Sequence, residues 1–318
     1  MCKRIGTLLP KQILKKANLS EFTTSKVGGK AKVVCPRNEK ELVQTLRTLE
    51  KNKICYKVIG NGSNLLASDS THKTIFVCTK NMQRVLDLYE NYLTVSAGTL
   101  ASEVILFCKN HQLSGLENLF GIPATIGGMV AMNAGAFKTN IFDHLINLKA
   151  FYNGEIVMID PQSVEKRNHF TELLGSGVTI LSATFELDLS SEEEIAEKIR
   201  RVSNQRFEKQ PKGNSAGCVF ANPEGDSAGR LIDLAGLKNT RIGNAFISDK
   251  HANFIISENA RFEDILKLIS LVQKTVFDKF GIWLETEIEI IGEKHENYGR
   301  LSHPQQIQQE QSRQKHNC

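Results

Sequence analysis

The stretch GLENLFGIPATIGGMVAMNAGAF, residues 115–137, decides the fold of this chain. It is dense in glycine and other small residues, and it carries no charge after Glu117. A glycine inside a helix or strand costs about 0.5–1 kcal/mol relative to alanine, and a flexible linker would be polar, so neither element explains this composition. Gly127 and Gly128 are predicted to open a short helix, where backbone N–H groups and the positive helix end point at one place. We therefore expect an anionic group to bind close to the backbone here.

A second glycine loop lies earlier in the chain. Residues 56–66, YKVIGNGSNLL, are predicted to form a short apolar strand that runs into a turn. A lone Gly-Asn-Gly turn is also typical of a plain hairpin connection. The two loops together, about sixty residues apart, favour a bound pyrophosphate. Neither is a Rossmann or P-loop motif, because Leu65 stands where the third glycine of G-x-G-x-x-G would be and no G-x-x-x-x-G-K-[ST] occurs.

The composition excludes several classes of protein. The 318 residues are 41% hydrophobic and 24% charged, which is ordinary for a globular protein of two or three compact units. The net charge of +5 is small and the charges are scattered, so anionic small ligands are favoured over nucleic acid. The seven cysteines form no C-x-x-C pair and the eight histidines form no H-E-x-x-H, so neither a disulfide framework nor a metal site is expected. We find no signal peptide and no apolar run of membrane-spanning length, and we expect a cytoplasmic protein.

The hydrophobic pattern predicts a mixture of helices and strands. Helical spacing of apolar residues predicts four longer helices, at residues 38–52, 101–113, 192–210 and 262–279. Short apolar runs predict strands at 57–60, 74–78, 92–96, 148–152, 155–159, 178–186 and 283–291. Strands and helices in this order, with an early glycine loop, indicate an α+β nucleotide-binding protein.

The two glycine segments carry a family resemblance. They resemble the two flavin-binding segments of the UDP-N-acetylenolpyruvoylglucosamine reductase family. The matching sequences are GNGSNLL at residues 60–66 and GIPATIGGMVAMNAGAF at residues 121–137. Further matching segments, in the same order, bring the resemblance to about residues 20–293. The chain is most similar to the shorter, second type of the family.

The resemblance implies a fold class and a domain plan. The expected fold is α+β, with a two-part FAD-binding unit of the vanillyl-alcohol-oxidase-like (PCMH) type and a C-terminal α+β substrate-binding domain. Residues 1–20 would be a lead-in, residues 21–190 the two lobes of the FAD-binding domain, and residues 200–293 the substrate-binding domain. The Gln-, His- and charge-rich residues 294–318 offer nothing to bury and are predicted to be disordered.

The resemblance also implies the ligands and the reaction. The enzyme would use FAD and NADPH to reduce UDP-N-acetylglucosamine-enolpyruvate, a UDP-sugar enolpyruvyl ether, to UDP-N-acetylmuramate for peptidoglycan. The positions that match the family's flavin segments are Gly60, Asn61, Gly62, Ser63, Asn64, Leu65, Gly121, Ile122, Pro123, Ala124, Gly127, Gly128, Asn133 and Gly135. Asn222 and Arg230 match positions near the substrate.

Three residues match the family's catalytic positions. Cys218, in GCVFANP, stands where the family generally has a serine that protonates the substrate carbon; a thiol with an unperturbed pKa near about 8.5 is still protonated at neutral pH and can donate. Glu287, in LETEIEIIG, matches the catalytic glutamate, although its alternating pattern is equally typical of a solvated sheet face. Arg167 matches the arginine near the developing negative charge, with Lys166 and His169 in place of the usual Tyr and Ser.

Two other functions fit part of the pattern. Another FAD-dependent oxidoreductase on the same cofactor fold, such as a hydroxy-acid or alcohol oxidase, would share the flavin segments. A non-catalytic nucleotide-binding or RNA-associated protein is the other class, but no base-stacking aromatic motif supports RNA binding.

Overall fold

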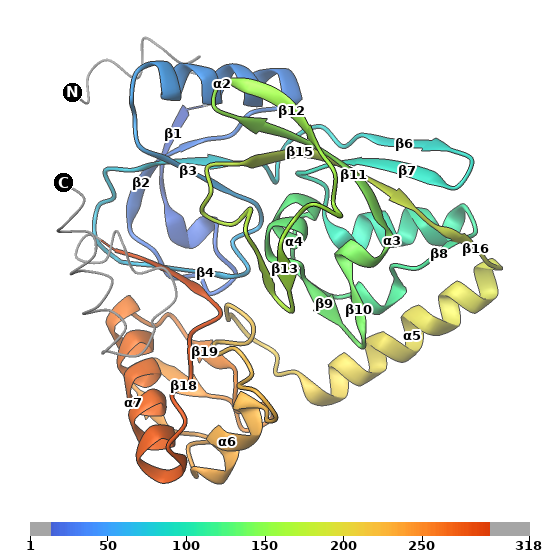
Figure 1. Ribbon diagram of the computed structural model, residues 1–318. Helices are drawn as coiled ribbons and strands as arrows, with labels where there is room; N and C mark the ends of the chain where they lie inside the picture. Colours follow the sequence, from blue (N-terminus) through green and yellow to red (C-terminus); the bar gives the residue numbers. More distant parts are fainter. Residues whose placement is uncertain (1–13, 293–318) are drawn as a thin grey trace. The chain divides into compact units, whose positions relative to one another are not determined.

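The computed structural model describes residues 14–292, so the first thirteen residues of the lead-in and the predicted tail at 294–318 lie outside the described residues. Helices and strands are mixed along the chain, as the sequence predicts (Figure 1). The chain divides into two compact units, and neither is one continuous segment. The first unit holds the residues up to Ala17, Ala31–Asn61 and Lys73–Glu208. The second holds Asn18–Lys30, Gly62–His72 and the residues from Lys209 onward.

The first unit contains a four-stranded sheet packed against one helix. The strand order is β1 (Leu14–Asn18), β2 (Lys30–Val34), β5 (Ile75–Cys78), β3 (Tyr56–Ile59), with β2 and β3 both parallel to β5. Helix α2 (Glu39–Lys51) begins at Asn38, whose side chain accepts a backbone N–H of the first turn. The leucines at helical spacing, Leu42, Leu46 and Leu49, are completely buried in the core of this sheet.

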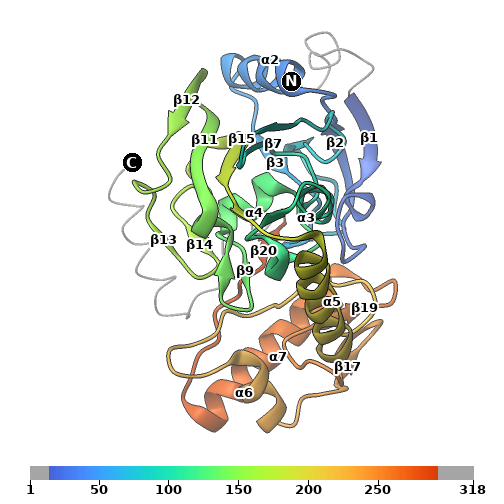
Figure 2. The same cartoon turned by 90° about the vertical axis from the view of Figure 1, so that its right-hand side faces the viewer.

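A five-stranded antiparallel sheet forms the other core of the first unit. The strand order is β12 (Glu155–Ile159), β11 (Leu145–Tyr152), β15 (Thr179–Glu186), β7 (Tyr92–Ser96), β6 (Leu86–Tyr89). Helices α3 (Ala101–Asn110) and α4 (Ile126–Met132) share one hydrophobic core with this sheet. Figure 2 shows both helices beside the sheet.

The helix predicted at residues 101–113 is shorter than expected. It ends at Asn110, and the chain reverses with Gln112 at φ 59°. Leu113–Ser114 then forms strand β8, which pairs with β16 (Asp188–Leu189). The prediction of its last residues was wrong because pairing with a distant strand overrides the local helical pattern.

The remaining elements of the first unit are short, apart from one helix. They are η2 (Glu117–Leu119), β9 (Gly135–Ala136), β10 (Thr139–Asn140), η3 (Ile141–His144), β13 (Lys166–Arg167), β14 (Phe170–Thr171) and the long helix α5 (Glu192–Lys209).

The second unit packs two helices against short strands. Helices α6 (Ala228–Leu234) and α7 (Phe262–Phe280) share a core with the antiparallel strands β17 (Arg241–Ile242), β18 (Ala245–Ile247) and β19 (Ile255–Ser257). A short 3-10 turn, η1 (Leu19–Glu21), belongs to the same unit. Strand β20 (Glu289–Ile291) runs parallel to β4 (Leu65–Ala67), which comes from the first glycine loop.

The last strand is also shorter than predicted. Regular pairing covers only Glu289–Ile291, whereas the sequence pattern predicts a strand over 283–291. The residues before Glu289 pair with an irregular segment around Phe220 rather than with a regular strand. The alternation of apolar and acidic residues in this segment still corresponds to an alternation in burial. Leu284, Ile288 and Ile290 are buried, whereas Glu285 is exposed.

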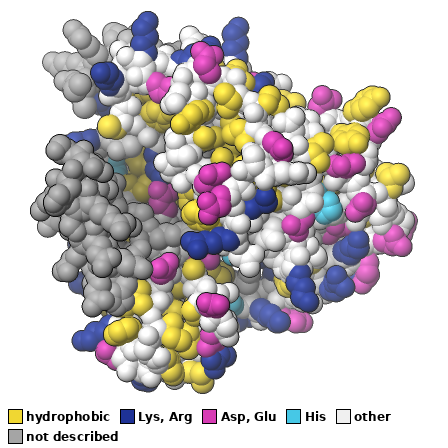
Figure 3. Space-filling view, in the orientation of Figure 1, with side chains coloured by type: hydrophobic (Ala, Val, Ile, Leu, Met, Phe, Trp, Pro, Cys, Tyr) yellow, Lys and Arg dark blue, Asp and Glu magenta, His cyan; other side chains and the backbone are white. Residues whose placement is uncertain are grey.

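The surface agrees with the sequence composition. On the face shown in Figure 3, basic and acidic side chains are interspersed rather than gathered by sign. Among residues 14–292, every helix is too short or too polar to cross a membrane.

Candidate active site

Helix α4 carries the two central glycines of the deciding stretch. Thr125 caps it, since its side chain accepts a hydrogen bond from the Gly128 N–H, so both glycines lie inside the first turn. A Cβ on Gly127 would lie 2.8 Å from the Ala97 Cβ, so close packing explains that glycine. Among the described residues, a Cβ on Gly128 would meet only the Thr125 Oγ1, at 3.4 Å. Packing within residues 14–292 therefore does not require a glycine at 128, and the open backbone fits a bound group that approaches it closely.

The start of the first glycine loop lies against the second glycine segment. The Asn61 Nδ2 donates a hydrogen bond of 2.6 Å to the Pro123 carbonyl, and a Cβ on Gly60 would lie 2.2 Å from the Thr125 Oγ1. The two segments that the sequence assigns to one cofactor thus meet within the first unit. Within the described part of the chain, the backbone N–H groups of Asn61, Gly62 and Ser63 make no hydrogen bond to a protein acceptor. Three consecutive free donors fit an anionic group such as a pyrophosphate.

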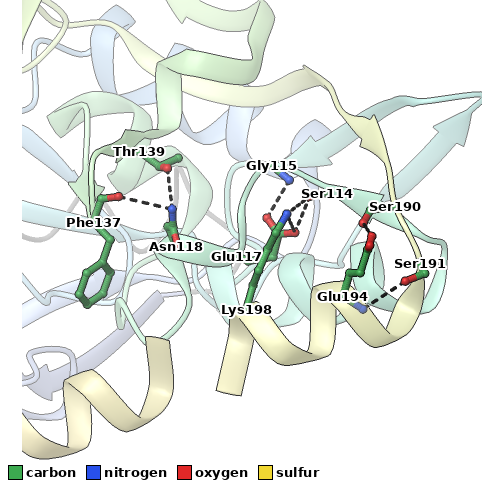
Figure 4. A network of polar contacts seen from close by, with 10 residues as sticks. All are labelled: Ser114, Gly115, Glu117, Asn118, Phe137, Thr139, Ser190, Ser191, Glu194 and Lys198. Carbon is green, nitrogen blue, oxygen red and sulfur yellow. Dashed lines mark hydrogen bonds and ion pairs between the residues drawn. The ribbon is translucent and has the colours of Figure 1, made fainter. Parts of the chain in front are cut away.

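A buried carboxylate anchors the second glycine segment (Figure 4). Glu117, only 4% exposed, accepts hydrogen bonds from the Ser114 hydroxyl at 2.6 Å and the Gly115 N–H at 2.8 Å. Lys198 on α5 donates to the Ser114 Oγ at 2.9 Å and lies 3.5 Å from the Glu117 Oε1. Burial is the largest influence and raises the pKa of Glu117, but the Ser114 hydroxyl, backbone N–H groups and the Lys198 ammonium outweigh it and hold that pKa below its ordinary value.

The neighbouring Asn118 fixes the same segment on its other side. Its Nδ2 donates to the Thr139 Oγ1 at 3.0 Å and to the Phe137 carbonyl at 3.4 Å (Figure 4). Our sequence analysis assigned no role to Glu117, Asn118 or Lys198. A signal was present, because Glu117 is the one charged residue in the whole stretch 115–137.

In the second unit, Cys218 and Glu287 lie on paired backbone segments. The Glu287 N–H donates to the Val219 carbonyl at 2.8 Å, and Phe220 bridges Thr286 in antiparallel register. Both candidate side chains are half-buried, whereas Glu285 on the same strand is exposed. Glu287 is thus more enclosed than a residue of a solvated sheet face.

Asn253 holds the Cys218 segment on its opposite side. It is 3% exposed, and its side chain accepts the Phe220 N–H at 2.9 Å and donates to the Phe220 carbonyl at 2.8 Å. Its own carbonyl accepts the Val219 N–H at 2.9 Å. Asn253 thus fixes the register of the segment that carries Cys218.

The first glycine loop also reaches the strand of Glu287. The Asn64 Nδ2 donates to the Glu287 carbonyl at 3.1 Å, and the Asn64 carbonyl accepts the Glu289 N–H at 2.9 Å. Leu65 follows in register with Glu289 at the start of the β4–β20 pair. The first glycine loop, which is predicted to bind the cofactor, is therefore hydrogen-bonded to the segment that carries the predicted catalytic residue Glu287. The sequence held no local signal for this contact, because it joins residues more than 200 positions apart.

Arg167 lies in the first unit, not in the unit of Cys218 and Glu287. It is exposed on β13, and its guanidinium carbon lies 4.8 Å from the centre of the Phe170 ring. Its carbonyl accepts a hydrogen bond of 3.1 Å from the Asn133 Nδ2, and Thr171 on the paired strand donates to the Ala131 carbonyl at 2.6 Å. The hairpin of Arg167 is thus attached to the end of α4.

The two predicted substrate residues lie at the start of α6. The Asn222 Oδ1 accepts the Ala228 N–H at 3.0 Å, and the Arg230 Nε donates to the Asp226 Oδ1 at 2.7 Å. Both side chains are exposed. Their role in substrate binding stays a prediction.

The remaining predicted cofactor positions are two glycines packed against side chains and four apolar residues that differ in exposure. Gly121 has a φ of 86° and faces Arg206, where a Cβ would lie 2.9 Å from the arginine Cδ. Gly135 is in β9, where a Cβ would lie 2.2 Å from the Asn140 Oδ1. Leu65 and Ala124 are buried, Ile122 is half-buried and Pro123 is exposed. In the described residues, no group of three or more His, Cys, Asp or Glu side chains could hold a metal ion.

Comparison with known proteins places these features in one group of enzymes. The model of the "UDP-N-acetylenolpyruvoylglucosamine reductase, C-terminal domain" matches residues 208–291, and the model of the "FAD binding domain" matches residues 31–160. The chain is 40% identical to the UDP-N-acetylenolpyruvoylglucosamine reductase of Caldicellulosiruptor bescii, over 89% of this chain and 91% of that protein. It is 38% identical to the enzyme of the same name from Fusobacterium nucleatum, over 88% of this chain and 99% of that protein.

A solved structure agrees with the sequence comparison. The crystal structure of the UDP-N-acetylenolpyruvylglucosamine reductase from Thermus caldophilus is 34% identical and superposes with a TM-score of 0.76, over 88% of this chain and 99% of that chain. The predicted fold class is confirmed: an α+β chain with a two-part FAD-binding unit and a C-terminal α+β domain.

Proposed function

The chain belongs to the UDP-N-acetylenolpyruvoylglucosamine reductase family, and from this we propose that it reduces UDP-N-acetylglucosamine-enolpyruvate to UDP-N-acetylmuramate, a step in peptidoglycan precursor synthesis. It is an FAD-dependent oxidoreductase that consumes NADPH. The observation that carries the proposal is the pairing of β4 with β20 together with the hydrogen bond from Asn64 to the Glu287 carbonyl. These contacts attach the first cofactor segment to the segment that carries Glu287.

We assign the cofactor to the two glycine segments. The free backbone donors at residues 61–63, the open backbone at Gly128 and the anchored turn at Glu117 support this assignment. When bound, FAD would supply the redox chemistry, a hydride transfer from NADPH to C3 of the enolpyruvyl group. The protein supplies position and charge: backbone donors for the pyrophosphate, and a loop fixed by Glu117 and Asn118.

The catalytic roles that we propose are those that the family resemblance implies for three side chains. Addition at C3 leaves carbanion character at C2, and the Cys218 thiol would deliver its proton to C2. Arg167 would bind the substrate carboxylate and stabilise the negative charge of its enol form. Glu287 would polarise the same carboxylate from the strand that Asn64 holds in place.

The other assignments concern the substrate and its surroundings. Residues 21–190 would hold FAD, and residues 200–293 would bind the UDP-sugar, with Asn222 and Arg230 near it. We also propose that the enzyme acts in the cytoplasm, as the sequence predicts.

The test uses the visible spectrum of the purified protein. NADPH added without oxygen should bleach a flavin band, and UDP-N-acetylglucosamine-enolpyruvate should then restore it promptly. A flavin band that NADPH bleaches but only oxygen restores would overturn the proposal in favour of an oxidase. A colourless protein that gains no flavin on refolding would overturn it altogether.

A further inference from the structure

The side chain of Asn133 is bonded at one end and open at the other. It is only 5% exposed, and its Nδ2 donates to the Arg167 carbonyl at 3.1 Å. Its Oδ1 is buried and finds no hydrogen-bond donor among residues 14–292. A swapped amide would place two oxygens against each other at Arg167, so the oxygen is the open end. Buried acceptors without partners are rare, and one that lies within a predicted cofactor segment is explained by a bound ligand.

The backbone conformation at Asn133 indicates that its side chain has a role of its own. Asn133 ends α4 in the left-handed region, at φ 43° and ψ 54°. Glycine adopts that conformation without strain, and asparagine is tolerated there less easily. The backbone alone would be served by glycine, so the amide has a role of its own.

A second asparagine repeats the same arrangement in the other unit. Asn64, from the first cofactor segment, donates its Nδ2 to the Glu287 carbonyl at 3.1 Å. Each cofactor segment thus contributes one asparagine whose amide holds the backbone of a candidate catalytic residue. In Asn133, the amide oxygen is in addition available to a further donor, because none of the described residues donates to it.

We propose that Asn133 is a positioning residue that links the bound cofactor to Arg167. Its Oδ1 accepts a hydrogen bond from an N–H or O–H group of FAD, and its Nδ2 holds the backbone of Arg167. This rests on the proposed function, which supplies the cofactor. FAD binding then fixes the β13–β14 hairpin, residues 166–171, and with it the guanidinium that meets the substrate.

The hairpin has a second attachment that provides a matched control. Thr171 donates its hydroxyl to the Ala131 carbonyl at 2.6 Å, also at the end of α4. Thr171→Val removes this bond with little change of shape and leaves the Asn133 oxygen in place. Asn133→Gly keeps the left-handed backbone and removes only the amide.

The experiment measures FAD affinity and hydrogen exchange, not turnover. Apoprotein of wild type and both variants is titrated with FAD by flavin fluorescence, and amide exchange of residues 166–171 is followed with and without FAD. In the wild type, FAD should slow exchange in the hairpin. Asn133→Gly should bind FAD about tenfold more weakly and lose that slowing. Thr171→Val should exchange faster in both states while its FAD affinity stays at the wild-type value.

The outcomes separate the two proposals. Wild-type FAD affinity in Asn133→Gly would overturn the inference, because the oxygen would then face water or nothing, while the proposed function would stand. A hairpin whose exchange is the same with and without FAD in the wild type would also overturn it. Wild-type apoprotein that binds no FAD would remove the proposed function and the inference together.

Discussion

At the scale of the residue, the two adjacent glycines of α4 are expected to have different roles: Gly127 allows close packing, and Gly128 leaves room for the cofactor. Gly128→Ala should stabilise the apoprotein by about 0.5–1 kcal/mol, because alanine favours a helix and its Cβ meets little there. The same variant should bind FAD more weakly, since the methyl group occupies the open backbone. Thermal unfolding of the apoprotein measures the expected gain in stability, and titration with FAD measures the expected loss of affinity. Gly127→Ala is the comparison, because its Cβ would press on Ala97 and should lower stability. Tighter FAD binding by Gly128→Ala would contradict the assignment.

Cys218 provides a test of the proton donor. Cys218→Ser should keep most activity, because a hydroxyl can deliver the same proton. Cys218→Ala should lose roughly 10²- to 10⁴-fold in the protonation step. Turnover and solvent deuterium incorporation at C2 measure the effect. The exposed Cys55 is the control, and Cys55→Ala should behave like the wild type. Unchanged turnover in Cys218→Ala would remove the assignment.

Glu287 has its own control on the same strand. Glu287→Gln should lower kcat by about 10²- to 10³-fold, because the amide cannot share a proton with the enol form of the substrate carboxylate as a carboxyl group can. Glu285→Gln, at an exposed position two residues earlier, should leave kcat unchanged. Equal kcat values for the two variants would show that Glu287 belongs to a merely solvated face.

At the scale of the element, the stability that Glu117 contributes to the turn at residues 114–117 should depend on pH. Its pKa is lowered in the folded protein, so the stabilisation is present above the unfolded value of about 4.3 and is lost as pH falls through the folded value. Glu117→Gln should therefore lower the Tm at neutral pH and approach the wild type under acid conditions. Thermal unfolding between pH 3 and 7 measures the difference. Glu194, exposed on α5, is the control, and Glu194→Gln should shift the Tm much less. A Tm difference independent of pH would contradict this account.

Local patterns predicted the longer helices well. The apolar spacing placed α2, α5 and α7 within one or two residues of their observed ends. A periodic apolar face specifies a helix through its own neighbours in the chain. The strand β4 was read as part of a loop, because its partner β20 lies far along the chain and left no local mark.

The site was predicted to a similar extent. The two glycine segments were expected to serve one ligand, and Asn61 and Pro123 do lie in contact. The bonds from Asn64 to Glu287 and from Asn133 to Arg167 were not foreseen. Each joins a side chain to a backbone carbonyl, and any residue offers that carbonyl, so its identity carries no signal.

At the scale of the whole molecule, the second unit is assembled from separate pieces of chain. A fragment of residues 209–292 lacks Gly62–His72, which contains β4, and lacks Asn18–Lys30. We expect this fragment to show no cooperative unfolding transition, because β20 and the core around Leu66 lose their partners. Circular dichroism during heating measures this, with residues 1–292 as the folded comparison. A sharp transition in the fragment would contradict the expectation.

The pairing of β4 with β20 also bears on how genes of this family can exchange parts. A single crossover near residue 200 would bring in a foreign C-terminal region while leaving its partner strand, residues 65–67, with the host sequence. Such a hybrid would join two strands that had never been selected together, beside the candidate glutamate. Recombination between distant relatives should therefore give a folded protein only where the segments that encode β4 and β20 come from the same parent. The two strands should then share one evolutionary history.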